Sequence, residues 1–325
     1  MKQSAIRLVI AACFLAAPFI GSAAEDAYPN KPIMLQVGFP PGQTTDTVAR
    51  LVAERAALKL GQPIVVINKP GQGGSLQLSS FVQQAPDGYT LTIAAAGATV
   101  TNQYLYKTVN YKTPDDFTPV GLVAEFPLVL VVRPGLPFDD LAGLIAYAKQ
   151  HPGKLNYASP GVGTSSHLAM ETLKSEAGVS IEHIPYQGSP QAITNLISGD
   201  VDIAFDTVTL LHSYISSGKL KALAIGSDDR FESLPEVPTM KESGYGTVPA
   251  RAWIGFLLPK GAAQNVVKKL STVFNSILND AEFKKKLSGL GAVVHTTTPQ
   301  EYEEMLRRES QNIGVIVKKA GLERK

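Results

Sequence analysis

Short apolar runs alternate along this chain with longer segments in which apolar residues recur every three or four positions. The short runs predict strands, because they are rich in Val and Ile and are bounded by Pro, Gly or Asn. The longer segments predict helices, and the first of them begins after candidate caps at Thr44, Thr45 or Asp46. In the first third of the chain the predicted strands are residues 31–39, 64–68 and 89–95, and the predicted helices are 45–60 and 76–84.

The same alternation continues through the middle of the chain and ends in a helical segment. The predicted strands here are residues 119–124, 128–132, 155–158, 181–184, 201–205, 220–225 and 252–258. The predicted helices are residues 141–149, 168–176, 191–198, 210–217, 264–279, 281–289 and 299–320. Regular exchange of strand and helix is typical of an α/β protein, and it predicts a parallel sheet.

Two apolar runs have similar endings, and they flank the middle block. Residues 128–135 and 254–261 each form an apolar strand that stops at Pro and Gly. We interpret them as two strands crossing between a discontinuous domain and an inserted one. The predicted organisation is lobe 1 at residues 25–127 and 253–325, and lobe 2 at residues 128–252. Two such lobes form a ligand cleft at the carboxyl ends of their strands.

The first 24 residues have the pattern of a secretory signal peptide. Lys2 and Arg7 precede an apolar run at residues 8–20, and small residues at 21–24 follow it. This run is shorter than the roughly 20 residues of a membrane-spanning helix. We therefore expect export and cleavage near Ala24. A lipid anchor at Cys13 is the alternative, although few apolar residues precede that cysteine.

The remaining composition excludes several classes of function. Cys13 is the only cysteine, so the exported chain has no disulfide and no thiolate nucleophile. Without Lys2 and Arg7 the 30 basic residues become 28, equal to the 28 acidic ones. A balanced charge argues against nucleic acid and anionic membranes as partners.

Two loops between a strand and a helix have the residues of an anion site. They span residues 39–46 and 158–167, and both combine glycine with Ser or Thr hydroxyl groups. Free N–H groups and the helix dipole favour a negative group at such a position. The alternative is that these residues only form turns and helix caps.

Motifs for nucleotide, metal or hydrolytic chemistry are missing from the sequence. It has no G-x-x-x-x-G-K-[ST], no G-x-S-x-G and no pair of histidines at zinc spacing. His167 is interpreted as a capping or packing residue in preference to a base. Asp206 follows a strand and fits either a ligand contact or a satisfied turn. We therefore expect no catalytic residue, no cofactor and no metal.

A series of motifs resembles one known family over essentially the whole exported chain. The motifs are Tyr28-Pro29-x-Lys31-Pro32-Ile33, Phe39-x-Pro41-Gly42, Asn68-x-Pro70-Gly71-x-Gly73-Gly74, Pro86-Asp87-Gly88-Tyr89, Gly163-Thr164-x-x-His167, His183-Ile184-Pro185-Tyr186-x-Gly188, Gly199-x-Val201-Asp202 and Pro235-x-Val237-Pro238-Thr239. In order and spacing they resemble the periplasmic substrate-binding proteins of tripartite tricarboxylate transporters, the Bug-type receptors. The resemblance implies a type II periplasmic binding fold that closes on a small carboxylate.

The resemblance also implies which residues contact the ligand. From lobe 1 they are Phe39, Pro41, Gly42, Gln43, Thr44, Thr45 and Asp46. From lobe 2 they are Ser159, Gly163, Thr164, Ser165 and His167. The rest of the wall is assigned to residues 95–99, including Ala95, Gly97 and Thr99, to residues 186–189, including Tyr186, Gln187 and Gly188, and to Asp206. Gln43 replaces a usual glycine and Gln77 a usual small residue, so we expect altered pocket chemistry.

The expected function is that of a solute-binding protein, not an enzyme. The resemblance implies that it is a periplasmic monomer and delivers a di- or tricarboxylate, aliphatic or aromatic, to membrane permease subunits. Two alternatives stay open at this point. One is a receptor that presents its ligand to a membrane sensor kinase, and the other, less favoured, is an exported hydrolase.

Overall fold

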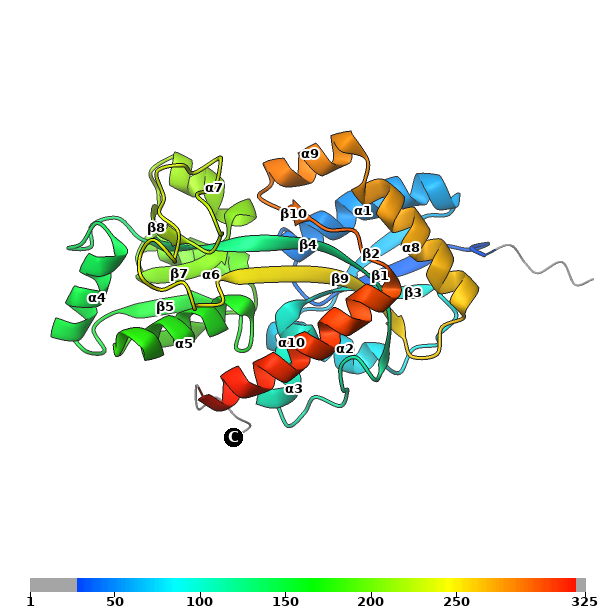
Figure 1. The fold of residues 1–325 in the computed structure, drawn as a ribbon, viewed down its shortest axis with the longest axis horizontal. Helices are drawn as coiled ribbons and strands as arrows, with labels where there is room; N and C mark the ends of the chain where they lie inside the picture. The colour runs from blue at the N-terminus through cyan, green and yellow to red at the C-terminus, as the bar shows by residue number, and fades with distance from the viewer. Residues whose placement is uncertain (1–27, 320–325) are drawn as a thin grey trace, which may run out of the picture.

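A computed structural model describes residues 28–319 as two halves joined by two long strands (Figure 1). The predicted signal peptide lies outside the described residues. The joining strands are β4 (Phe117–Val132) and β9 (Arg251–Pro259). None of the helices between residues 28 and 319 has both the length and the apolar character that a membrane span requires.

The first half contains both ends of the described chain. Its strands are β1 (Ile33–Val37), β2 (Ile64–Asn68), β3 (Thr90–Ala95) and β10 (Val293–Val294). Its helices are α1 (Thr44–Leu60), α2 (Ser75–Phe81), α3 (Asn102–Leu105), α8 (Gln264–Leu278), α9 (Ala281–Gly289) and α10 (Pro299–Lys319). It also has a short 3₁₀ helix at Gln72–Gly74 and a π-helical turn at Gly97–Thr101.

The second half is formed by the middle of the chain. Its strands are β5 (Asn156–Ser159), β6 (Glu182–Pro185), β7 (Ile203–Thr207) and β8 (Lys221–Ile225). Its helices are α4 (Leu141–Gln150), α5 (Ser165–Ala177), α6 (Ser189–Ser198) and α7 (Val208–Ser216). Figure 1 shows these elements gathered at one end of the molecule, with α10 running diagonally between the two halves.

The sheet is mixed, which corrects the prediction of a parallel one. Strands β2, β1 and β3 are parallel, as are β6, β5 and β7. Strand β9 is antiparallel to both β3 and β4, and β4 is antiparallel to β7, β8 and β10. The strand order β2-β1-β3-β9-β4-β7-β5-β6 therefore places the joining strands at the centre. Helix-connected βαβ units are parallel, whereas strands that only connect the halves need not be.

The prediction of separate strands at 119–124 and 128–132 is wrong, because β4 is continuous. Residues Glu125, Phe126 and Pro127 pair with the start of β9, and Leu128 N–H donates to Ala250 O at 2.9 Å. The register of the ladder shifts between Pro119 and Gly121 and again between Leu122 and Ala124, whereas Pro127 pairs with Arg251 without a shift. A continuous strand joins the halves as one stiff element.

Each half has its own apolar core. In the first half, side chains of β1, β3, α1 and α8 such as Leu35, Ile93 and Leu270 are fully buried. In the second half, Leu144, Tyr157 and Phe205 form the corresponding core. Separate cores are typical of separate domains. The exact domain boundaries stay a prediction.

Candidate functional site

The N-termini of four helices meet where the two halves face each other. Helices α1, α5, α6 and α7 all begin at loops that contribute to, or adjoin, one cavity of about 50 Å³. The cavity is lined by Phe39, Gln43, Thr44, Thr45, Ala95, Gly97, Phe126, Leu128, Pro160, Thr164, Ser165, Ser166, Asp206, Thr207, Ala252 and Ile254. Unpaired N–H groups of the first helical turn make this an environment for a negative group.

In the first half, Asp46 fixes the loop that precedes α1. It accepts a hydrogen bond from the Gly42 N–H at 2.9 Å and forms an ion pair with Arg50 at 2.9 Å. Asn68 donates to it at 2.8 Å. Burial alone would raise the pKa of Asp46, but hydrogen bonds from Arg50, Asn68 and Gly42 outweigh burial and lower it. Asp46 is thus a structural residue that does not line the cavity.

The N-cap of α1 is Gln43, with no capping bond from its side chain, so the predicted caps at Thr44, Thr45 and Asp46 are wrong. This difference has a functional consequence. The hydroxyl groups of Thr44 and Thr45 are not used as caps, and both residues line the cavity.

In the second half, the loop before α5 is held by its own side chains. Thr164 caps the helix, accepting from the His167 N–H at 3.4 Å, and its hydroxyl donates to Gly161 O at 2.7 Å. His167 Nδ1 accepts from the Gly163 N–H at 3.3 Å. Burial lowers the pKa of His167 to about 4, so the ring is neutral. These bonds leave Ser165 and Ser166 exposed to the cavity.

The two halves are in direct contact around the cavity. The hydroxyl groups of Thr44 and Thr207 are 2.7 Å apart, and the Ser189 N–H donates to Gln43 Oε1 at 3.1 Å. At Gly97 the backbones approach so closely that a Cβ atom would lie 2.5 Å from the Gly163 carbonyl oxygen. The structure is therefore in a closed arrangement, in which only a small volume remains between the halves.

An apolar wall completes the cavity. It comes from the joining strands, where Phe126 and Leu128 of β4 face the cavity together with Ala252 and Ile254 of β9. Side chains alternate between the two faces of a strand, so every second residue points the same way. These four residues were not predicted, because an apolar strand residue in a cavity wall and one in a core have the same sequence pattern.

Of the predicted site residues, the structure brings nine together in the cavity wall. These are Phe39, Gln43, Thr44, Thr45, Ala95, Gly97, Thr164, Ser165 and Asp206. It places the other ten behind the wall or on its rim: Pro41, Gly42, Asp46, Thr99, Ser159, Gly163, His167, Tyr186, Gln187 and Gly188. Several of these hold the loops, as Ser159 does by its 2.7 Å hydrogen bond with His183 Nε2. Pro160, Ser166 and Thr207 were also missed.

Gln77, the second departure from the family pattern, is buried away from the cavity. Its amide donates to Gln36 Oε1 at 3.1 Å and accepts from Thr92 at 3.2 Å. Gln43 is therefore the departure that changes the cavity wall itself.

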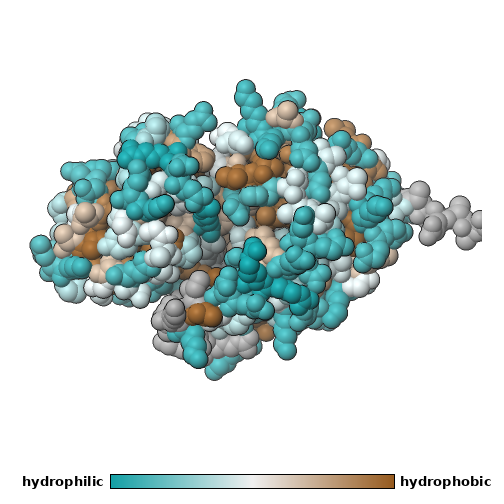
Figure 2. Space-filling model, viewed as in Figure 1, coloured by the Kyte–Doolittle hydropathy of each residue, from teal (hydrophilic) through white to brown (hydrophobic). Residues whose placement is uncertain are grey.

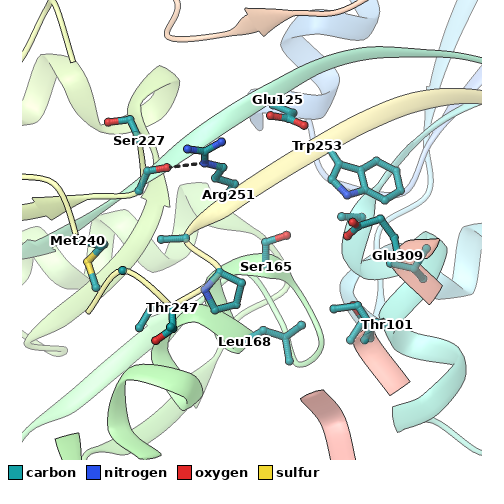
Figure 3. Close-up of a pocket in the computed structure, with 18 of the residues that line it drawn as sticks. Thr101, Glu125, Ser165, Leu168, Ser227, Met240, Thr247, Arg251, Trp253 and Glu309 are labelled. Carbon is teal, nitrogen blue, oxygen red and sulfur yellow. Dashed lines mark hydrogen bonds between the residues drawn. The ribbon is translucent and has the colours of Figure 1, made fainter. Parts of the chain in front are cut away.

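A larger groove of about 470 Å³ lies on the opposite face of the joining strands (Figure 3). Glu125, Arg251 and Trp253 alternate with the cavity residues and line this groove. Arg251 pairs with Asp228 at 2.6 Å and donates to Gly226 O at 3.0 Å. Figure 2 shows a mostly hydrophilic face hollowed between the halves. Arg251 is thus already paired, while Lys241 and Arg308 also line the groove. The smaller cavity is the better candidate for an anion site because three helices begin at or next to residues of its wall.

The wall of the cavity carries no basic side chain. Among the residues that line it, none is Lys, Arg or His, and Asp206 is the single charged residue. Within residues 28–319 no group of three His, Cys, Asp or Glu side chains is arranged to hold a metal ion. Recognition of an anion here depends on backbone N–H groups and hydroxyl groups.

Comparison with known families identifies the class of protein. A model described as the tripartite tricarboxylate transporter family receptor matches residues 48–322. The chain belongs to this family. The family is periplasmic, and its members are solute-binding proteins rather than enzymes.

Three solved structures are similar to this family receptor over almost its whole length. The periplasmic binding protein BugD is 35% identical, with a TM-score of 0.87 over 92% of this chain and 100% of that chain. R. palustris Rpa4515 with adipate is 31% identical, with a TM-score of 0.88 over 92% and 100%. MatC from Rhodopseudomonas palustris with bound malate is 31% identical, with a TM-score of 0.84 over 89% and 100%. They confirm the predicted periplasmic binding fold.

Proposed function

We propose that this receptor binds a small carboxylate between its halves and delivers it to a tripartite tricarboxylate-type permease. The observation that carries the proposal is the convergence of helix N-termini and of Thr and Ser hydroxyl groups on one cavity. Each hydrogen bond to a charged group contributes about 1.5–3 kcal/mol. Three or four of them, less the entropy lost on association, are enough for micromolar binding.

The residues that line the cavity and the ligands bound by two similar proteins both indicate the class of ligand. One side of the cavity is polar, and the β4 and β9 side chains form an apolar side, which suits a carboxylate on a short carbon skeleton. Rpa4515 with adipate and MatC with malate support a dicarboxylate. Gln43 adds an amide to the wall, so the preferred acid differs from that of a relative with glycine there.

Capture requires the halves to separate and close again. A volume of about 50 Å³ holds only a few water molecules, at roughly 10–15 Å³ each by this measure. A dicarboxylate therefore enters an open form and shifts the population toward a closed one. We propose that the halves correspond to lobes 25–127 with 253–325 and 128–252, and that the closed form is what the permease recognises.

The remaining predictions belong to the same proposal. The signal peptide is cleaved near Ala24, the receptor acts as a monomer in the periplasm, and it leaves its ligand chemically unchanged.

A thermal-shift screen tests the binding proposal. Protein purified without denaturation is heated with a panel of mono-, di- and tricarboxylates that includes adipate and malate. A ligand at 100 times its Kd stabilises the folded state by about 2.7 kcal/mol, which raises the melting temperature by several degrees. No stabilisation by any carboxylate would contradict the proposal.

Two threonine variants assign the stabilisation to the cavity. Thr45 is buried in the wall of the cavity. Thr45→Val replaces its hydroxyl group by a methyl group at nearly unchanged side-chain volume, and it is expected to weaken binding about threefold to tenfold. Thr272→Val, on the exposed face of α8, is the matched control and should bind normally. Equal binding by the two variants would place the ligand elsewhere.

An uptake assay tests delivery to a permease against presentation to a sensor. Cells without this gene should fail to accumulate the radiolabelled acid identified in the screen, and the wild-type gene should restore accumulation. Unchanged uptake, with loss of a transcriptional response to the acid, would favour the sensor kinase alternative.

A further inference from the structure

An acidic side chain stands in the wall of a cavity that we assign to an acidic ligand. Asp206 is the fourth residue of β7, and only 5% of it is exposed. Its Oδ1 accepts from the Thr207 N–H at 2.7 Å. The lining residues include no cation that would neutralise two carboxylates together.

Asp206 lies close to the place where a ligand carboxylate is expected. The neighbouring Thr207 contacts Thr44 across the halves, with 2.7 Å between their hydroxyl groups. Thr44 is the first residue of α1, and all three residues line the same cavity of about 50 Å³. A carboxylate at the N-terminus of α1 is therefore within a few ångströms of Asp206, and two like charges at that range are not both ionised without a large cost.

We propose, on the basis of the proposed function, that Asp206 shares one proton with the bound carboxylate, so that an anionic ligand is taken up together with a proton. The proton comes from solvent and lies between a carboxyl oxygen of Asp206 and an oxygen of the ligand. No other bond is made or broken. The complex then carries one negative charge less, and the neutral carboxyl group becomes a hydrogen-bond donor to the ligand.

The environment of Asp206 already favours its protonated form. Burial raises its pKa to about 6, and hydrogen bonds from Thr207 offset burial only in part. The proton is therefore added at low cost near neutral pH, and at increasing cost above it. A second carboxylate in the cavity raises the same pKa further.

Other charged groups around β7 do not take over this role. The titratable residues on the elements packed against β7, and on α1 across the cavity, include Asp46, Arg50, Glu125, Tyr157, His167, Glu171, Lys174 and His212. None of them contributes to the pKa shift of Asp206. Asp46 is paired with Arg50, and Glu171 is paired with Lys174 at 2.6 Å. His167 is neutral above pH 4 to 5 because its pKa is about 4.

The test is the pH dependence of binding, measured by calorimetry with adipate and malate as probes from pH 6.5 to 9. For the wild-type receptor we expect the affinity to fall by up to tenfold for each pH unit. Titrations at pH 8 in buffers of different ionisation enthalpy should show uptake of close to one proton per ligand. Asp206→Asn keeps a donor of the same shape, so its affinity should be independent of pH and higher than that of the wild type at pH 9.

The other possible outcomes distinguish a failure of proton sharing from a failure of the proposed function. Binding by the wild type that is independent of pH, without proton uptake, overturns proton sharing and leaves carboxylate capture intact. Affinity that rises with pH overturns it as well, since binding of the dianion would then not require a proton on Asp206. Failure of both proteins to bind any carboxylate from pH 5 to 9 contradicts the proposed function itself. The proton count on the wild type decides the question even if Asp206→Asn does not fold.

Discussion

At the scale of single residues, Gln43 shows how one side chain connects the two halves. It stands where the family resemblance predicts glycine, and it is 7% exposed. Its Oε1 accepts the Ser189 N–H at the start of α6 in the other half. The amide therefore both shapes the cavity wall and adds one hydrogen bond that exists only when the halves are closed.

Replacing Gln43 by alanine should weaken ligand binding, because the closed form loses that bond while the open form loses nothing. A net hydrogen bond is worth about 0.5–1.5 kcal/mol, which corresponds to a Kd about twofold to tenfold higher. Calorimetry with the best ligand of the screen measures the change. Gln83→Ala, at an exposed position, is the control. Tighter binding by Gln43→Ala would show that the amide only obstructs the cavity.

The site residues were predictable where they lie on the two loops, and not where they lie on the joining strands. Thr44, Thr45 and Ser165 follow from loop composition and helix position. Phe126 and Ile254 do not, because an apolar strand residue in a core and one in a cavity wall have the same sequence pattern. Only the packing of β4 against β9 distinguishes them.

At the scale of elements, most predicted strands and helices lie within a few residues of those observed. The differences arise where tertiary contacts override local signals. The predicted break between residues 124 and 128 is absent, and β4 continues because β9 supplies a partner through this segment. The two-residue strand β10 exists only because β4 pairs with it, and nothing in its own sequence predicts it.

One element carries a testable dependence on pH. His167 is the third residue of helix α5, and its ring lies against the ring of His183 of β6, with the centroids 4.5 Å apart and the ring planes tilted by 35°. Burial lowers the folded-state pKa of both rings to about 4, from 6.5. The unfolded chain therefore binds more protons between pH 6.5 and 4. The stability that these neutral rings contribute is complete above pH 6.5 and is lost as the pH falls toward 4.

The expected loss from His167 alone is about 1–2 kcal/mol of unfolding free energy between pH 7 and pH 5. Urea denaturation at the two pH values measures it. His167→Asn retains an acceptor near the position of Nδ1 but does not titrate, so its stability should depend less on pH than that of the wild type. The exposed His151→Asn is the control and should keep the wild-type slope. Equal slopes in all three proteins would show that the buried ring is not the source.

At the scale of the whole molecule, the joining strands have the ligand cavity on one face and a larger groove on the other. Phe126 and Ile254 face the ligand cavity, whereas Glu125 and Trp253 face the groove of about 470 Å³ behind it. If the cavity opens by rotation about β4 and β9, we expect the walls of the groove to approach each other. The walls are the segment after β8 on one side and α10 on the other, and Ser227 and Glu309 mark them in Figure 3.

A bulky side chain in the groove should therefore tighten ligand binding without touching the ligand. Ser227→Trp occupies space that the open form needs, so it raises the free energy of the open form and leaves the closed form largely unchanged. We expect a Kd several-fold lower, through slower dissociation, and a smaller radius of gyration in small-angle scattering without ligand. Ser180→Trp, at an exposed position outside the groove, is the control and should change neither quantity. If Ser227→Trp also changed neither, opening would not narrow this groove, and the two halves would have to separate by a motion other than rotation about β4 and β9.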